Sequence, residues 1–195
     1  MNEGVTKPEA VLAFWLDEVG EAGWYAGGDA LDRTVRERFE GLWALAAVGE
    51  LRAWRSTARG ALALAVLLDQ MPRNMFRGER RAFSTDAQAR QVADGAIARG
   101  FDRAVEMPGR QFFYLPFEHS ESLPDQERAV RLIAGRTGSA ELLLHARAHR
   151  AVIRRFGRFP FRNEALGRRS TAAEAAWLEA GAYGAEVRRL REAAG

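Results

Sequence analysis

The chain of 195 residues contains no cysteine and a single lysine, Lys7. The absence of cysteine excludes disulfides, thiolate zinc sites and cysteine nucleophiles, and it leaves the redox compartment open. Nearly all of the positive charge is therefore arginine, whose planar guanidinium suits carboxylate and phosphate oxygens. A codon bias would explain the shortage of lysine equally well.

Long apolar runs are also absent. The longest, Ala61–Leu68, is too short to cross a bilayer, and the N-terminus lacks the basic region and apolar core of a secretory signal. With 47% hydrophobic and 28% charged residues, the composition is that of a soluble globular protein. We expect a cytoplasmic protein that forms a single domain over residues 1–195.

Several common motifs do not occur: GxxxxGK[ST], GxGxxG, GxSxG and HExxH. The sequence therefore does not support a common type of nucleotide-binding site or hydrolase active site, and we predict no cofactor and no metal. The net charge is only +3, and acidic residues are interleaved throughout. This pattern argues against nucleic-acid binding.

What the sequence does contain is helical periodicity from end to end. Leu31, Val35, Phe39 and Leu42 trace one helix face, and no alternating strand pattern competes. The segment Gly60–Gln70 is apolar on every side, which predicts a central buried helix that stops near Pro72. The pattern indicates an all-α protein built from antiparallel helix pairs.

The C-terminal third has two further helix signals. Leu142, Ala146, His149 and Ile153 share one face of a long helix that we expect Gly157 to end. His149 should therefore be mostly buried and hydrogen-bonded to a polar group from another part of the chain. Thr171-x-x-Glu174 predicts a capping box.

The segment 154–171, RRFGRFPFRNEALGRRST, is the most informative stretch. Its arginines alternate with phenylalanines, which favours an ordered segment that lines a site. One interpretation is an anion pocket formed by Arg158, Arg162 and Asn163, with phenyl rings excluding water. The other is a rigid linker whose arginines pair with Glu118, Glu121 or Asp69.

A second polar cluster follows directly on the apolar helix: Asp69, Gln70, Arg73, Asn74 and Arg77. It would lie at the edge of the core, where the low dielectric strengthens polar contacts. The structural alternative is an Asp69–Arg73 pair at i,i+4, together with caps for freed backbone carbonyls.

A third group, Glu118, His119 and Glu121, places three titratable side chains within four positions. They could serve acid–base catalysis or a carboxylate-rich metal site. The spacing matches no standard metal motif. We favour a role for Glu118 and Glu121 as counter-charges of the C-terminal arginines over a metal site.

Five blocks in order resemble the bacterial DUF924 family: VLAFWLDE, LLDQMPRNMFRG, FSTDAQAR, FFYLPFEHSESLPDQE and HRAVIRRFGRFPFRNEALGRRST. The resemblance implies an all-helical, tetratricopeptide-like fold, an α-α superhelix. It implies no activity, because the family is named for its unknown function. One departure is Phe161, where the family pattern commonly has histidine, and this argues against a metal role for that segment.

We therefore predict that the polar blocks converge on one arginine-lined cleft, with Asp69, Arg73, Glu118 and Arg162 in a single cluster. The predicted ligand-binding residues are Asp69, Arg73, Asn74, Arg77, Arg110, Arg158, Arg162 and Asn163. The leading hypothesis is binding of an anionic small molecule or an acidic peptide. The alternative is an acid–base hydrolase or lyase that uses Glu118 or Glu121 with His119 or His149. A third hypothesis is a buried polar network that only fixes the packing.

Overall fold

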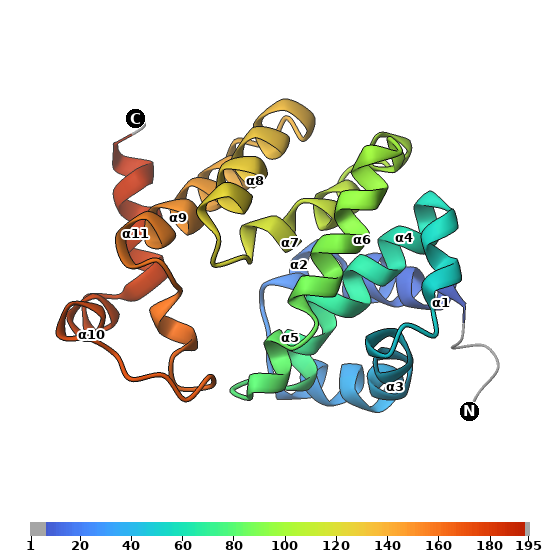
Figure 1. The fold of residues 1–195 in the computed structure, drawn as a ribbon, viewed down its shortest axis with the longest axis horizontal. Coiled ribbons are helices and arrows are strands. Elements are labelled where there is room, and N and C mark those ends of the chain that lie inside the picture. Colours follow the sequence, from blue (N-terminus) through green and yellow to red (C-terminus); the bar gives the residue numbers. More distant parts are fainter. Residues whose placement is uncertain (1–6, 194–195) are drawn as a thin grey trace. The chain divides into compact units, whose positions relative to one another are not determined.

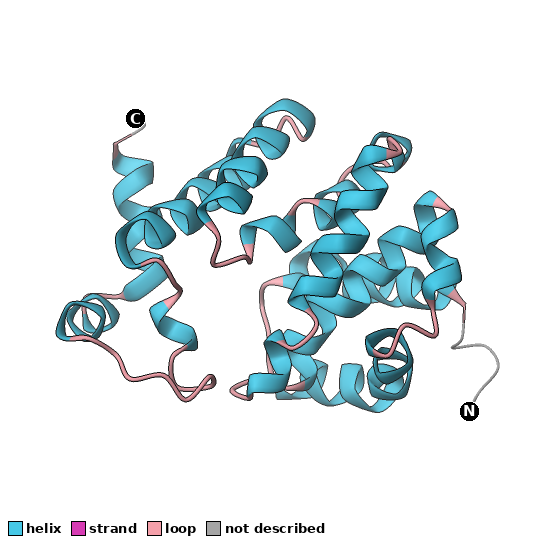
Figure 2. Cartoon of the chain, in the orientation of Figure 1, coloured by secondary structure: helices cyan, strands magenta, loops and turns pink. Residues whose placement is uncertain are grey.

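The computed structural model describes residues 7–193, and every regular element within them is helical (Figure 2). This confirms the all-α prediction. Residues 1–6, the first part of the segment in which we expect no secretory signal, lie outside the described residues. The chain forms two compact units that divide between Pro116 and Phe117. The single domain and the tetratricopeptide-like arrangement stay predictions.

The first unit combines one long helix, α3, with shorter ones (Figure 1). Its α-helices are α1 (Pro8–Leu12), α2 (Gly20–Trp24), α3 (Asp29–Ala47), α4 (Ala58–Ala65), α5 (Met71–Met75) and α6 (Asp86–Ala98). Two π-helical turns, Ala13–Val19 and Val66–Gln70, and four 3-10 turns, Arg52–Ser56, Arg80–Phe83, Phe101–Ala104 and Gly109–Phe113, complete it. The short helix α7 (Leu115–Glu118) follows at the boundary between the units.

The core of the first unit is aromatic and surrounds α4. The apolar face predicted for α3 is buried at Val35, Phe39 and Leu42, and α4 is buried from Gly60 to Ala65. Trp24 meets the ring of Phe112 edge-on at 4.8 Å. Such edge-to-face pairs stabilise a core beyond the area that they bury. No helix within residues 7–193 combines the length and apolar character that crossing a bilayer requires.

The central helix does not stop near Pro72, as we expected, but continues to Met75 through a π-helical turn. Proline has no N–H, so Pro72 cannot bond the carbonyl of Leu68, its partner in an α-helix. The hydroxyl of Thr85 donates to that carbonyl instead, at 2.7 Å. The guanidinium of Arg73 donates to the next carbonyl, that of Asp69. The hydroxyl of Thr85 thus replaces the bond that Pro72 cannot make, and the helix passes through the proline.

The second unit consists of α8 (Leu123–Arg136), α9 (Ala140–Phe156), α10 (Ala172–Glu179), α11 (Ala182–Glu192) and a 3-10 turn, Pro160–Arg162. A turn at Gly138, with φ of 66°, joins α8 to α9, and the two helices lie side by side (Figure 1). Gly157 ends α9 in the left-handed conformation, with φ of 69°, as predicted. The capping box of Thr171 and Glu174 is also confirmed.

Candidate functional site

The second unit contains a carboxylate–imidazole pair, Glu118 with His149. Glu118 is the last residue of α7, and only 3% of it is exposed. His149 lies in the middle of α9, its side chain 15% exposed, with Nδ1 only 2.8 Å from Oε1 of Glu118. The prediction for His149 is therefore confirmed: it is mostly buried and bonded to a polar group from another block.

The oxygens around Nδ1 of His149 determine where its proton sits. Besides Glu118, the carbonyl of His145 lies 3.0 Å away and the hydroxyl of Tyr183 lies 3.1 Å away. A carbonyl and a carboxylate can only accept hydrogen bonds, so Nδ1 must carry the proton. This assignment, made from the partners, leaves the lone pair of the neutral ring on Nε2.

Tyr183 and His145 extend this arrangement toward the surface. The Tyr183 hydroxyl lies 2.7 Å from Nδ1 of His145, 3.1 Å from Nδ1 of His149 and 3.4 Å from the carbonyl of His145. With a protonated Nδ1 on His149, the hydroxyl can donate only to His145, whose Nδ1 is the nearer of its two acceptors. Nε2 of His145 then carries a proton and faces Oε1 of Glu141 at 3.2 Å. With these tautomers the contacts Tyr183–His145 and His145–Glu141 have one proton each, and the single Nδ1 proton of His149 is shared among Glu118, the carbonyl of His145 and Tyr183.

The backbone that carries Glu118 is held by a buried amide. Gln126 of α8 is fully buried, and its Nε2 donates to the carbonyls of Glu118 at 2.5 Å and Ser120 at 2.7 Å. The second carboxylate oxygen of Glu118, Oε2, is buried and accepts no hydrogen bond from the described residues. Most buried polar atoms have a partner, so an exception beside an imidazole is a feature of interest.

Aromatic rings flank His149. The ring of Phe159 lies 5.6 Å from it, edge-on, and that of His119 lies 6.0 Å from it. Phe161 stacks on Phe159 at 5.2 Å and is 44% exposed. The guanidinium of Arg162, a residue only 6% exposed, lies 4.5 Å from the centre of the Phe159 ring. The imidazole thus has an apolar wall.

Glu121 has a different environment from Glu118. Arg168 binds it through two hydrogen bonds of 2.7 and 2.9 Å, and the backbone N–H of Phe159 donates to it at 2.8 Å. Burial by itself raises the pKa of Glu121, but these bonds and the charges of Arg168 and Arg162 outweigh it and lower the pKa. The counter-charge interpretation is confirmed for Glu121. It is wrong for Glu118, whose ionic partner is a histidine.

The predicted ligand-binding residues of the second unit are engaged with their own chain. Arg158 makes two hydrogen bonds to Glu174, of 2.6 and 2.8 Å, and a third to the carbonyl of Arg169. The bond from Arg158, with those from Thr171, lowers the pKa of Glu174 to about 2. Asn163 binds Ser170 and Arg168.

An open hollow of about 590 Å³ lies beside α10. It is lined by Arg155, Phe156, Arg158, Thr171, Ala173 and Glu174. The guanidinium of Arg155 lies 4.8 Å from the ring centre of Phe156, and Arg155 is exposed. Arg158 is already bonded to the carboxylate of Glu174. The exposed guanidinium of Arg155 is therefore the group of this hollow best placed to bind an anion.

In the first unit, Arg73 binds two carboxylates. Its guanidinium lies 3.3 Å from Asp69, confirming the i,i+4 pair, and makes hydrogen bonds of 3.1 and 3.2 Å to Asp86. Asn74 and Arg77 both donate to Asp32. Burial raises the pKa of Asp32, but hydrogen bonds from these two residues outweigh it, so the pKa is lowered.

Arg110, also among the predicted ligand-binding residues, donates from Nε to the carbonyl of Val105 at 2.9 Å. The structure therefore joins the predicted residues into clusters within each unit. The single cluster of Asp69, Arg73, Glu118 and Arg162 stays a prediction. No group of three or more metal-ligating side chains occurs among residues 7–193.

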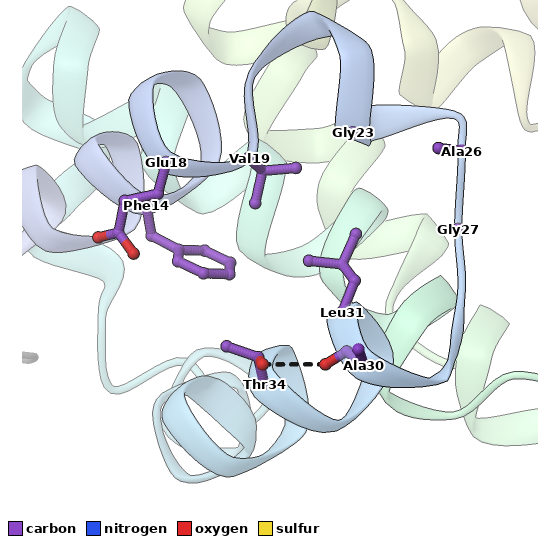
Figure 3. Close-up of a pocket in the computed structure, with 9 residues that line it drawn as sticks. All are labelled: Phe14, Glu18, Val19, Gly23, Ala26, Gly27, Ala30, Leu31 and Thr34. Atoms are coloured by element: carbon purple, nitrogen blue, oxygen red, sulfur yellow. Dashed lines mark hydrogen bonds between the residues drawn. The ribbon is translucent and has the colours of Figure 1, made fainter.

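A second hollow, of about 410 Å³, lies in the first unit between the π-helical turn Ala13–Val19 and α3. Figure 3 shows Phe14, Val19 and Leu31 directed toward it. Its one charged lining residue, Glu18, is held by two hydrogen bonds from Arg38. This hollow is apolar and holds no group suited to proton transfer.

Sequence reasoning did not identify Tyr183 or the role of Glu174. Tyr183 lies near the start of α11, and nothing in its local pattern separates it from a core residue. The capping box indicated that Glu174 lies in the first turn of a helix. It did not indicate that the Glu174 carboxylate also accepts a hydrogen bond from Arg158. His145 lies at i,i+4 from His149, a spacing that places both imidazoles on one side of α9.

The comparisons with known proteins agree with this fold. A family model described as "Bacterial protein of unknown function (DUF924)" matches residues 11–182. The chain is similar to a solved structure, the protein of unknown function ATU0120 from Agrobacterium tumefaciens. The two are 42% identical, with a TM-score of 0.84 over 88% of this chain and 96% of that chain. None of the curated proteins matches.

Proposed function

The chain belongs to the bacterial family of unknown function DUF924, and we propose that its second unit carries a general acid–base centre formed by Glu118 and His149. The observation that supports this proposal is the 2.8 Å contact between a buried carboxylate and Nδ1 of the imidazole. A carboxylate in this position orients the ring, fixes its tautomer and stabilises the imidazolium that forms when Nε2 takes a proton.

The chemistry that suits this pair is proton transfer in a hydrolase or a lyase. Nε2 of His149 would remove a proton from a bound water or from the substrate, and it would later return that proton to the leaving group. Glu118 acts on the substrate only through the ring. The phenyl rings of Phe159 and Phe161 would form the apolar part of the substrate site.

The contacts of the arginines favour this function over the arginine-lined cleft. Arg158 and Arg168 each hold a carboxylate of their own chain through two hydrogen bonds. A ligand anion would have to displace Glu174 or Glu121, both of which have lowered pKa values and stay charged at neutral pH. Glu118, by contrast, is paired with an imidazole, a ring that can act as both acid and base.

The test is a screen of hydrolase and lyase substrates with the natural protein and three variants. For any substrate that is turned over, Glu118→Gln and His149→Gln should lower kcat by about 10²–10⁴, the usual contribution of a general base. His119→Gln is the matched control, because it removes the neighbouring imidazole, and it should retain most of the activity. Full activity in Glu118→Gln or His149→Gln would refute the proposal.

A second measurement needs no substrate. The ¹⁵N shifts of the His149 ring should show a protonated Nδ1 and an unprotonated Nε2 in the neutral protein. The opposite tautomer would leave no lone pair on Nε2 and would overturn the proposed base. Glu118→Gln should keep the tautomer, since the carbonyl of His145 still accepts from Nδ1.

The hollow beside α10 supports a second candidate function, binding of an anionic small molecule or an acidic peptide. The supporting observation is Arg155, an exposed arginine that stacks on Phe156 next to Arg158. Phosphate, citrate and an oligoglutamate peptide are suitable probes. They should raise the melting temperature of the natural protein and of Arg154→Gln, whose guanidinium is paired with Glu127, but not that of Arg155→Gln. Equal shifts in all three proteins would exclude this site.

A further inference from the structure

The acid–base pair is connected to the surface of the second unit by two more side chains. From Nδ1 of His149 the contacts run 3.1 Å to the Tyr183 hydroxyl and 2.7 Å onward to Nδ1 of His145. Nε2 of His145 then faces Glu141 at 3.2 Å. Each contact is within hydrogen-bond distance. The tautomers assigned above supply a proton to each link, and the Nδ1 proton of His149 is shared between Tyr183 and Glu118.

Exposure rises along this row. The side chain of Glu118 is 4% exposed and that of His149 is 15% exposed. The side chain of His145 is 37% exposed, and that of Glu141 is 61% exposed. The row therefore begins in the interior and ends in solvent. Tyr183 bridges the two histidines because α11 packs against α9 and presents the hydroxyl between residues one helical turn apart.

We propose that Tyr183 and His145 form a proton path between His149 and the solvent. This inference rests on the proposed function of His149, which it extends. Tyr183 and His145 are positioning and relay residues rather than catalytic residues, because they act only through the His149 ring.

The transfer balances in protons and charge. When Nε2 of His149 takes a proton, its Nδ1–H bond breaks and that proton binds the Tyr183 oxygen. The Tyr183 O–H bond breaks in turn, and its proton binds Nδ1 of His145. His145 then releases the proton on Nε2 to water or to Glu141. One proton enters at His149 and one leaves at His145, and the reverse sequence restores both tautomers.

The charges around the path fit a positive charge that moves outward. Glu118 stabilises it at His149, and Glu141 stabilises it at His145. The titratable and charged groups that face the path are Glu118 and His119 beside His149, Glu141 and Arg191 beside His145, and Arg162 behind the ring of Phe159. Arg191 binds Glu141 at 2.6 Å and so favours release of the proton from His145.

The test measures exchange of the Nδ1 proton of His149 with water by NMR, in the absence of any substrate. Tyr183→Phe removes only the hydroxyl and should slow this exchange about tenfold, the effect of one lost hydrogen-bonded link. His145→Gln removes the next link and should slow it similarly. Arg154→Gln, a change at the far end of α9 that touches no link, is the control and should leave the rate unchanged.

Unchanged exchange in both Tyr183→Phe and His145→Gln would overturn the path. If Tyr183→Phe fails to fold, His145→Gln decides alone, because its side chain lies nearer the solvent. The ¹⁵N shifts add a second criterion: in Tyr183→Phe, His145 should lose its single tautomer while His149 keeps its own. These readouts do not depend on turnover, so the path can fail while the Glu118–His149 centre stands, and the reverse.

Discussion

Each unit contains a buried carboxylate, and the two units pair it with different cationic side chains. In the first unit, Asp69 and Asp86 meet the guanidinium of Arg73, which is charged at every physiological pH. In the second unit, Glu118 meets the imidazole of His149, whose ring can both donate and accept a proton. The arginine cluster can only hold the fold together, whereas the histidine pair can also move a proton.

The arginine pairs inside the second unit sharpen this contrast. Glu121 and Glu174 lie in the same unit as Glu118, yet their partners Arg168 and Arg158 lower their pKa values and favour the ionised form. The choice of partner therefore separates structural carboxylates from the functional candidate more clearly than burial or position in the chain does. The predictions below test this separation, from the largest expected effect to the smallest.

Arg73→Ala should have the largest effect on stability. It removes the guanidinium from Asp69, which is 1% exposed, and from Asp86, and removing one partner of a buried ion pair costs about 3–5 kcal/mol. Urea denaturation followed by tryptophan fluorescence measures the loss. Arg77→Ala is the control, because Arg77 is exposed, and it should cost less than about 1 kcal/mol. If Arg73→Ala destabilised the protein as little as Arg77→Ala is expected to, the Arg73 cluster would not be structural.

The positions of helices followed from the sequence because apolar spacing and glycine stops are local signals. Val35, Phe39 and Leu42 and the stop at Gly157 needed no tertiary information. The passage through Pro72 did need it, because the hydroxyl that replaces the lost backbone bond belongs to Thr85, seventeen positions apart from Leu68 and outside the helix.

The candidate site was predictable only in part, for the same reason. The helical row of His149 showed that it is buried, and the block around Glu118 showed a cluster of titratable groups. Which carboxylate meets which base depends on how α7, α9 and α11 pack, and no local pattern encodes this. The sequence therefore did not indicate Tyr183. Nor did it show that the guanidinium of Arg158, predicted to bind a ligand, forms an ion pair with Glu174.

The second effect concerns the stability of the protein in acid. The pKa of Glu174 is lowered from 4.5 to about 2 in the folded state, so the unfolded chain binds more protons between these values. The stabilisation is complete above the unfolded pKa, and it is lost as the pH falls from about 4.5 toward about 2. Glu174→Gln keeps a side chain that can form the capping box but removes the charge.

Melting temperatures of the natural protein and Glu174→Gln, measured from pH 5 to about pH 2, test this. The melting temperature of the variant should depend less on pH across that window. Arg158→Gln should also flatten the curve, because it removes the bond that contributes most to the lowered pKa. Parallel curves for all three proteins would contradict the assigned role of this pair.

Glu118→Gln should have a smaller effect on stability than Arg73→Ala while changing the chemistry of the site. The amide oxygen can still accept from Nδ1 of His149, so we expect a loss of only about 1 kcal/mol, the usual net value of one hydrogen bond. Urea denaturation and the substrate screen, made on the same preparation, compare the two effects. A loss as large as that of Arg73→Ala would identify Glu118 as a structural carboxylate.

The smallest effect is expected for Arg191→Ala, at the outer end of the proton path. Arg191 and Glu141 are more than half exposed, and an ion pair between such side chains contributes about 0.2–1 kcal/mol. Raising the salt concentration should reduce the difference from the natural protein further, since exposed pairs are screened. Exchange of the Nδ1 proton of His149 should stay within a factor of about two, because each link from His149 to His145 remains. A strong loss of stability would mean that the exposed end of α11 holds the second unit together. Exposed and buried ion pairs of this unit would then contribute similarly to its stability.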